Sequence, residues 1–313
     1  MKRLRRTALA LSLCASLLAA PGAFAAEIQS LNGRSETVTV TIPDSPARIA
    51  VIDAAVLDML DHWGLGDRIV ALPKTTKIPA FERYYADKAI LDVGTLKEVS
   101  LERLMESEPD VIFISGRLAK KYDELSRIAP VVYLTPDRKG GAFASFAKNL
   151  RQVAKVFGQD VEEMAEADIR RFEERLAAIR EKAKGHTALV GLVTSSHVNL
   201  LGNAARCSLI GNEFGFTNVA EKANANHGNE ASFELLVKHD PDYFFVLDRD
   251  SAIARPGAKL AQDILNNEMV DRMRAKKNDR IVYLTPATWY LAEGGVKAMD
   301  SMFSDVEKAL GLR

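Results

Sequence analysis

Two arginines, Arg117 and Arg249, occupy equivalent positions in an internal repeat, and a pair of guanidinium groups is suited to binding an anion. Residues 100–117 read SLERLMESEPDVIFISGR, and residues 232–249 read SFELLVKHDPDYFFVLDR. At a fixed offset of 132 the coinciding residues include Ser100/Ser232, Glu102/Glu234, Leu104/Leu236, Pro109/Pro241, Asp110/Asp242 and Arg117/Arg249. Each arginine follows an apolar run typical of a strand, and open α/β sheets bind ligands beyond the carboxyl ends of their strands. Two similar lobes facing each other would bring both guanidinium groups to one cleft.

Three further side chains are of types that suit a charged or metal-containing ligand. Arg206 lies in LLGNAARCSLIGNEFGF, near the start of a predicted helix, where its charge opposes the helix dipole and makes it a candidate ligand contact. His227 lies in the polar loop NANHGNEAS, and Tyr290 lies in TPATWYLAEGG. Each residue also has a purely structural interpretation: a surface arginine in an ion pair, a solvated loop histidine, and a tyrosine packed beside Trp289.

A matched pair of carboxylates, Glu102 and Glu234, stands in the first turns of the two repeated helices, each two residues after a serine. Helix capping and compensation of the helix dipole explain both residues, at about 0.3–1 kcal/mol each. Alternatively, one carboxylate on each lobe would be presented to a partner that has two-fold symmetry.

The sequence lacks the common catalytic and metal-binding motifs. It contains no HExxH motif, no Gly-rich phosphate loop and no GxSxG elbow. The histidines are scattered over His62, His186, His197, His227 and His239. Beyond the N-terminal segment described next, the only cysteine is Cys207, which excludes an intramolecular disulfide and cysteine-ligated zinc or iron–sulfur sites. We therefore predict a binding protein and not an enzyme.

The first 25 residues have the pattern of a signal peptide. Basic residues at 2–6 precede an apolar run over 8–20 and an A-x-A cleavage site at 23–25. No small residue precedes Cys14 where a lipoprotein signal needs one, so we predict cleavage after Ala25 and a soluble exported protein. Removing 25 of the 313 residues leaves 288, with 38 basic and 42 acidic residues and a net charge of −4. This balance gives no reason to expect nucleic-acid binding.

The segments that must position these residues alternate between apolar strands and helical patterns, as in α/β proteins with parallel sheets. A second repeat, VYLTP at 132–136 and 282–286, follows the first in the same order in both halves. The predicted strands are Ile49–Ile52, Ile69–Leu72, Val111–Ile114, Val131–Leu134, Ala188–Val193, Tyr243–Leu247 and Ile281–Leu284. The predicted helices include Ala54–Trp63, Leu101–Ser107, Arg206–Phe214, Phe233–Lys238 and Ala258–Leu265.

A segment of different character separates the two halves. Residues 159–184 contain no glycine or proline, and their apolar residues recur at helical spacing. We predict one helix of about 25 residues, roughly 37 Å long, that joins the lobes and limits hinge motion between them. The predicted organisation is a signal peptide over 1–25, an N-terminal α/β lobe over 26–158, the connecting helix over 159–185 and a C-terminal α/β lobe over 186–313. Each lobe is expected to have a mainly parallel sheet flanked by helices.

Taken together, these features resemble the substrate-binding proteins of ABC importers for iron siderophores, haem and vitamin B12. The similarity covers essentially the whole mature chain. Within that family, five segments are similar to the CeuE-type catecholate siderophore binders: SGR at 115–117, NLLGNAARCSLIG at 199–211, NHGNEASFE at 226–234, LDR at 247–249 and TPATWYLAEGG at 285–295.

The resemblance implies the fold of a type III periplasmic binding protein and a ligand held in the cleft between the lobes. It implies that a ferric catecholate lies over Arg117, Arg206 and Arg249. His227 and Tyr290 would complete the coordination of the iron when the siderophore is only tetradentate. Fe(III) would be bound as a siderophore complex, and no intrinsic cofactor is expected.

The resemblance also implies a periplasmic location and a partner in the inner membrane. Glu102 and Glu234 would dock onto the two permease subunits of an ABC importer with its ATPase, and the protein would act as a monomer. Haem or vitamin B12 in the same fold is the alternative ligand. An exported siderophore esterase or metal-dependent hydrolase, and a protein that binds bare zinc or manganese, are alternatives of other classes.

Overall fold

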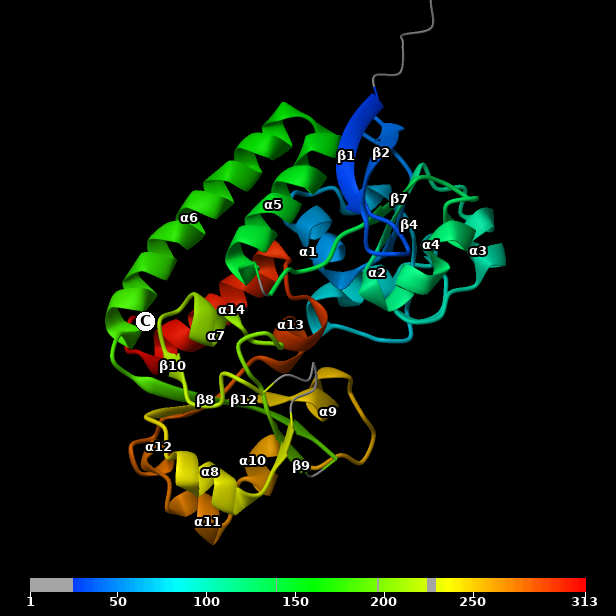
Figure 1. Ribbon diagram of the computed structural model, residues 1–313. Coiled ribbons are helices and arrows are strands. Elements are labelled where there is room, and N and C mark those ends of the chain that lie inside the picture. Colours follow the sequence, from blue (N-terminus) through cyan, green and yellow to red (C-terminus); the bar gives the residue numbers. More distant parts are fainter. Residues whose placement is uncertain (1–24, 139, 196, 224–228) are drawn as a thin grey trace, which may run out of the picture.

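The computed structural model describes residues 25–138, 140–195, 197–223 and 229–313 of the chain. These residues form two α/β lobes, each built around one sheet, with a long helix that runs along one side of the molecule beside both (Figure 1). The predicted fold class is therefore confirmed.

The N-terminal lobe contains a five-stranded parallel sheet in the order β5-β4-β3-β6-β7. Both of its faces are covered, so β3 and β6 are buried along their whole length, which explains their Val- and Ile-rich sequences. A separate antiparallel hairpin, β1-β2, precedes this sheet, and β1 packs beside β7. The strands are β1 (Ala25–Leu31), β2 (Thr37–Pro43), β3 (Ile49–Ile52), β4 (Ile69–Leu72), β5 (Leu91–Asp92), β6 (Val111–Ile114) and β7 (Val131–Tyr133).

The C-terminal lobe contains a mixed sheet in the order β11-β9-β8-β12-β13, with β10 also paired to β8. The pairs β8-β12, β12-β13 and β8-β10 are parallel, whereas β9 runs antiparallel to both β8 and β11. The antiparallel edge arises because a short connection containing Ser195, at a φ of 50°, reverses the chain directly from β8 into β9. The strands are β8 (Thr187–Thr194), β9 (His197–Leu200), β10 (Thr217–Asn218), β11 (Asn229–Ala231), β12 (Tyr243–Asp248) and β13 (Ile281–Tyr283).

Helices flank both sheets, and short 3-10 segments join several of them. The helices of the first half are α1 (Ala54–His62), α2 (Glu82–Ala86), α3 (Leu101–Glu106), α4 (Tyr122–Leu125), α5 (Ala142–Ala154) and α6 (Gln159–Ala183). Those of the second half are α7 (Leu209–Asn212), α8 (Phe233–His239), α9 (Arg249–Ala252), α10 (Ala261–Ile264), α11 (Glu268–Asp271), α12 (Arg274–Lys277), α13 (Pro286–Leu291) and α14 (Val296–Ala309). The 3-10 helices are η1 (Gly66–Arg68), η2 (Pro79–Phe81), η3 (Gly116–Lys121) and η4 (Lys155–Phe157). Within the ranges that the structure describes, no helix is both long and apolar enough to cross a membrane.

Two predicted helices are shorter than expected. The prediction of a helix over 206–214 is wrong at its start, because Cys207 has a φ of 60° and a helix cannot continue through that conformation. Arg206 therefore lies in a turn before α7. The helix predicted over 258–265 is reduced to α10, since Leu260 has an extended backbone.

The long helix α6 packs an apolar stripe against the rest of the molecule. Its first turn carries Asp160 and Glu162 and its last turn Arg180 and Lys182, so the charges at both ends complement the helix dipole. Its buried side chains include Ala165, Ile169, Phe172, Leu176 and Ile179. Because these residues belong to one core that also contains residues of both sheets, α6 is fixed to both lobes.

The centre of that shared core is a group of phenylalanines around Phe303 of α14. The ring of Phe303 lies 5.1 Å from that of Phe172, 5.0 Å from that of Phe214 and 6.3 Å from that of Phe143, measured between centroids. These rings come from α5, α6 and the segment after α7, so one side chain joins four parts of the chain. Phe303 is fully buried.

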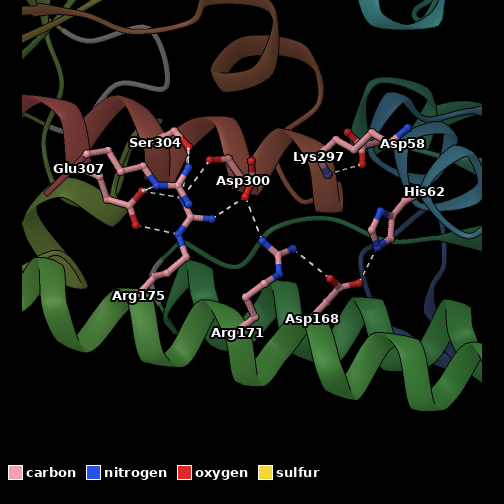
Figure 2. Close-up of polar contacts among 10 residues, drawn as sticks. Asp58, His62, Asp168, Arg171, Arg175, Lys297, Asp300, Ser304 and Glu307 are labelled. Atoms are coloured by element: carbon pink, nitrogen blue, oxygen red, sulfur yellow. Dashed lines mark hydrogen bonds and ion pairs between the residues drawn. The ribbon is translucent and has the colours of Figure 1, made fainter.

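A chain of polar contacts runs along the same joint and fastens α6 to α14 and α1 (Figure 2). Arg175 bonds to Glu307 through Nε at 2.7 Å and to Asp300 through Nη1 at 2.6 Å. Arg171 continues the chain between Asp300 and Asp168, and the contacts at Asp168 lower the pKa of that carboxyl group despite its burial. The remaining oxygen of Asp168 lies 2.7 Å from Nε2 of His62 in α1. The lobes are therefore joined by both polar and apolar contacts.

Asp58 of α1 caps the first turn of α14 from the other end of the chain. Its two carboxylate oxygens accept hydrogen bonds from the backbone N–H groups of Lys297, at 2.7 Å, and Ala298, at 2.9 Å. Burial raises the pKa of Asp58 to about 6, because the charged form loses its water and the capping bonds only partly compensate.

This raised pKa predicts a pH dependence of stability. A carboxyl group with a higher pKa in the folded state contributes its stabilisation below its ordinary value of 3.8 and loses it as the pH rises through about 6. The variant Asp58→Asn does not titrate, so the fall in free energy of unfolding between about pH 4 and pH 7 should shrink by roughly 1–2 kcal/mol. Chemical unfolding across this range measures the difference. Parallel pH profiles for the two proteins would contradict the raised pKa.

Candidate functional site

Arg117 lies just beyond the carboxyl end of β6, an interior strand of the N-terminal sheet. Ser115 caps η3 by accepting a hydrogen bond from the backbone N–H of Arg117 at 3.4 Å. The side chain is half-buried, and its Nη2 donates to the backbone oxygen of Tyr290 at 3.4 Å. The buried carboxyl group of Asp53, at the end of neighbouring β3, has a pKa that burial raises and that the charge of Arg117 partly lowers.

Arg249 holds the equivalent position in the C-terminal lobe, directly after β12. Asp248 caps α9 by accepting from the backbone N–H of Ser251 at 2.9 Å, which fixes the start of the turn that carries Arg249. Nε of Arg249 donates to the hydroxyl oxygen of Tyr290 at 2.9 Å, and Nη1 donates to Oγ1 of Thr194 at 3.1 Å. Asp250 is its ion-pair partner, at 3.4 Å.

Arg206 approaches the same tyrosine from the turn before α7. Its Nη1 donates to the backbone oxygen of Tyr290 at 3.0 Å, and its guanidinium carbon lies 4.3 Å from the centre of the Tyr290 ring. Burial lowers the pKa of Arg206, and the positive charge of Arg138 lowers it further. Nε of Arg206 is buried without a hydrogen-bond partner among the described residues.

The structure therefore brings Arg117, Arg206, Arg249 and Tyr290, which the sequence places far apart, to one point. Tyr290 lies on α13, which packs against α9 between the two sheets (Figure 1). His227 lies outside the described residues, so its predicted place beside Tyr290 stays a prediction. Within the described ranges, no group of three or more His, Cys, Asp or Glu side chains could hold a metal ion.

The arrangement is suited to an anion that accepts several hydrogen bonds. A guanidinium group offers five N–H donors in a fixed plane, and only some of those of each arginine are used by Tyr290 and Thr194. Arg117 and Arg206 form no ion pair with a described residue, so their charges are available to a ligand. Three such groups over a tyrosine provide both charge and directional donors.

Two further charged residues border this cluster and were missed by reasoning from the sequence. Arg138, in the loop after β7, forms an ion pair with Glu293, in the connection between α13 and α14. Their side chains are 19% and 8% exposed. The signal was present in the repeat, because each residue follows one copy of VYLTP within the next seven positions.

The two predicted docking residues, Glu102 and Glu234, are exposed in the first turns of α3 and α8. Ser100 and Ser232 cap these helices in the same way, each accepting a backbone hydrogen bond at 3.3 Å from the residue three positions later. A hydrogen bond from its own backbone N–H and one from Ser232 lower the pKa of Glu234. The structure thus shows one exposed carboxylate in the same local setting on each lobe.

Comparison with known proteins gives consistent matches over nearly the whole chain. A family model described as "Periplasmic binding protein" matches residues 49–288. The petrobactin-binding protein YclQ of Bacillus subtilis is 32% identical over 272 residues, which cover 86% of this chain and 84% of that protein.

Solved structures also superpose on nearly the whole chain. The crystal structure of YclQ superposes with a TM-score of 0.83 at 30% identity, covering 91% of this chain and 99% of that one. The periplasmic catecholate-siderophore binding protein VctP of Vibrio cholerae also gives a TM-score of 0.83, at 28% identity, covering 90% of this chain and all of that one. Since the family model spans well over half of the sequence, the chain belongs to the periplasmic binding protein family.

Proposed function

We propose that this protein captures ferric catecholate siderophores in the cleft between its lobes and delivers them to the permease of an ABC importer. The observation that carries the proposal is the convergence of Arg117, Arg206 and Arg249 on Tyr290 from separate parts of the fold. The similarity to a petrobactin-binding protein and to a catecholate-siderophore binding protein supports it.

The chemistry of the ligand fits the cluster. Catecholate oxygens on Fe(III) leave the complex with a net negative charge, and arginines donate charge-assisted hydrogen bonds to such oxygens. A tetradentate siderophore leaves two positions on the iron open, and we assign them to the phenolate oxygen of Tyr290 and to His227. A phenolate is a hard oxygen donor that suits a ferric ion, and imidazole is a common ligand of iron. Iron enters this scheme only as cargo, bound as the siderophore complex, and no intrinsic cofactor is part of it.

The proposed function also assigns a domain organisation and a location to the protein. We assign residues 1–25 to a cleaved signal peptide, 26–158 and 186–313 to the two lobes, and 159–185 to the helix between them. The mature protein is then a soluble periplasmic monomer. Its family consists of periplasmic binding proteins, and we assign it no enzymatic activity.

Titration of the purified protein with iron complexes tests the ligand. Fe(III) complexes of a hexadentate tris-catecholate and a tetradentate bis-catecholate should both quench tryptophan fluorescence and appear as one-to-one complexes by native mass spectrometry. Only the tetradentate complex should change its charge-transfer absorption on binding, since only it has iron positions open to the protein. Binding of haem or a corrinoid with neither ferric complex bound would overturn the assignment.

The two exposed glutamates provide a separate test of delivery. The double variant Glu102→Ala and Glu234→Ala should bind ferric catecholate like the wild type but lose most of its affinity for the permease, on the order of ten-fold or more. The physical reason is the loss of one carboxylate on each lobe that would meet a basic pocket on each permease subunit. Affinity for the transporter in nanodiscs and uptake of radioactive iron measure the effect. The double variant Glu173→Ala and Glu174→Ala, at exposed positions of α6, controls for the loss of two negative charges. Unchanged uptake in the Glu102 and Glu234 double variant would refute the docking role.

A further inference from the structure

The ion pair between Arg138 and Glu293 stands next to the arginine cluster and plays no part in the binding scheme above. Arg138 follows β7 of the N-terminal lobe, whereas Glu293 follows the helix that carries Tyr290. The pair therefore links the first lobe to the segment on which Arg117, Arg206 and Arg249 converge.

Stability alone explains this pair poorly. Oε1 of Glu293 and Nε of Arg138 are both buried without a hydrogen-bond partner among the described residues. Each of these atoms loses its hydrogen bonds to water on folding and gains no protein partner in exchange. Buried ion pairs with unsatisfied atoms contribute little net stability, because desolvation offsets the attraction. A role in the charge of the site is a better explanation.

Both members of the pair act on the cluster. Burial has the largest effect on the pKa of Arg206 and lowers it; the charge of Arg138 also lowers it, and the charge of Glu293 raises it. The thiol of adjacent Cys207 is influenced by the same two charges. The geometry agrees, because Arg138 is paired with Glu293, which lies only three residues after Tyr290. Arg138 therefore counts as a fourth cation beside the cluster, and Glu293 neutralises it.

We propose that Glu293 sets the net charge of the cleft and thereby determines how strongly the protein discriminates between ferric catecholates of different charge. This inference rests on the proposed function. An iron with three catecholates is a trianion and an iron with two is a monoanion, so each unit of positive charge in the cleft favours the first more than the second. With Glu293 present, Arg138 adds no net charge and the preference for the trianion stays moderate.

The test compares four proteins that differ only in these two charges. Dissociation constants for the ferric tris-catecholate and the ferric bis-catecholate are measured by fluorescence quenching for the wild type, Glu293→Gln, Arg138→Gln and the double variant. Glu293→Gln should raise the preference for the trianion on the order of ten-fold, and this gain should fall at high salt. Arg138→Gln, which leaves an unpaired carboxylate, should lower the preference by a similar factor.

The double variant separates charge from structure. Losing both partners restores the net charge, so its preference should return to within about two-fold of the wild type, although a defect in folding or packing would persist in it. Glu174→Gln has the same change in net charge as Glu293→Gln at a distant exposed position and should leave the preference unchanged.

The results separate a failure of the proposed siderophore function from a failure of the role of Glu293. If the wild type binds neither complex, the proposed function fails and this inference falls with it. If the wild type binds both complexes but Glu293→Gln and Arg138→Gln shift the two dissociation constants equally, the siderophore function stands and the role of Glu293 is refuted. If Glu293→Gln does not fold, as judged by circular dichroism, the opposite shift expected for Arg138→Gln decides the question alone.

Discussion

Replacing Arg206 with methionine should abolish most of the affinity for ferric catecholate while leaving the stability of the protein nearly unchanged. The guanidinium group of Arg206 bonds to the backbone of Tyr290 and stacks on its ring, so a ligand above that tyrosine loses a desolvated, charge-assisted donor. Truncating one partner of such a buried pair costs roughly 2–5 kcal/mol, which corresponds to an affinity loss of about thirty-fold to a few thousand-fold.

The free energy of unfolding of Arg206→Met should change little, although its affinity for the ligand falls. Burial lowers the pKa of Arg206, so the fold already disfavours its charge, and its Nε has no partner among the residues described. Methionine still covers the Tyr290 ring, and we expect the free energy of unfolding to stay within about 1 kcal/mol of the wild type.

Titration with the ferric tris-catecholate and urea denaturation measure the two effects on Arg206→Met. The exposed residue Arg127 provides the matched control, because Arg127→Met removes the same charge far from the cluster. Loss of stability in parallel with loss of binding would mean that Arg206 is mainly structural.

Phe303→Ala should destabilise the whole protein by about 4 kcal/mol, the largest effect that we expect from a single core substitution. Its ring contacts those of Phe143, Phe172 and Phe214, and Arg175 lies over it at 5.2 Å. Alanine leaves a cavity at the point where four segments meet, and those segments cannot collapse onto it because α6 and α14 are held by the ion pairs of Figure 2.

Urea denaturation of wild type, Phe303→Leu and Phe303→Ala measures this effect. The leucine variant keeps most of the volume and should lose roughly 1–2 kcal/mol. Because the core is continuous through both lobes, all three proteins should unfold in a single transition. Two separate transitions, or a loss below about 1 kcal/mol for the alanine variant, would show that the lobes do not share this core.

Much of the fold could be predicted because its elements have strong local signals. The connecting helix has no glycine or proline before residue 185 and a regular apolar stripe, so its predicted range of 159–185 begins with α6 and ends two residues after it. The central strands of both sheets are continuous apolar runs, which explains their accurate bounds. By contrast, the hairpin β1-β2 is absent from the predicted elements, although the alternation in TVTVTIP was a usable signal.

Elements fixed by tertiary context were harder to predict. The turn at Arg206 looks helical in composition, and only the left-handed conformation of Cys207 interrupts the pattern. The terminal helix α14 was also missed, although Met299, Met302, Phe303 and Val306 lie at helical spacing. Its burial depends on α1 and α6, which lie far away in the sequence.

In the candidate site too, residues marked by a local sequence pattern could be predicted, whereas contacts between distant residues could not. The repeat predicted that Arg117 and Arg249 lie at equivalent strand ends and come together, and in the structure both side chains contact Tyr290. It could not identify the ion pair of Arg138 with Glu293, which joins residues 155 positions apart. Both residues follow a copy of VYLTP, but Arg138 does so by two positions and Glu293 by seven, so the repeat alone does not show that their side chains meet.

The capping of α14 by Asp58 has a consequence for the order in which the molecule is assembled. A nascent chain that ends before residue 296 lacks the helix that packs against α1, so its first lobe has an incomplete interior. Final consolidation of the N-terminal half must then await the arrival of the C-terminal segment. In the export that we propose, late closure of this kind would keep the polypeptide loosely structured until its C-terminal segment has arrived.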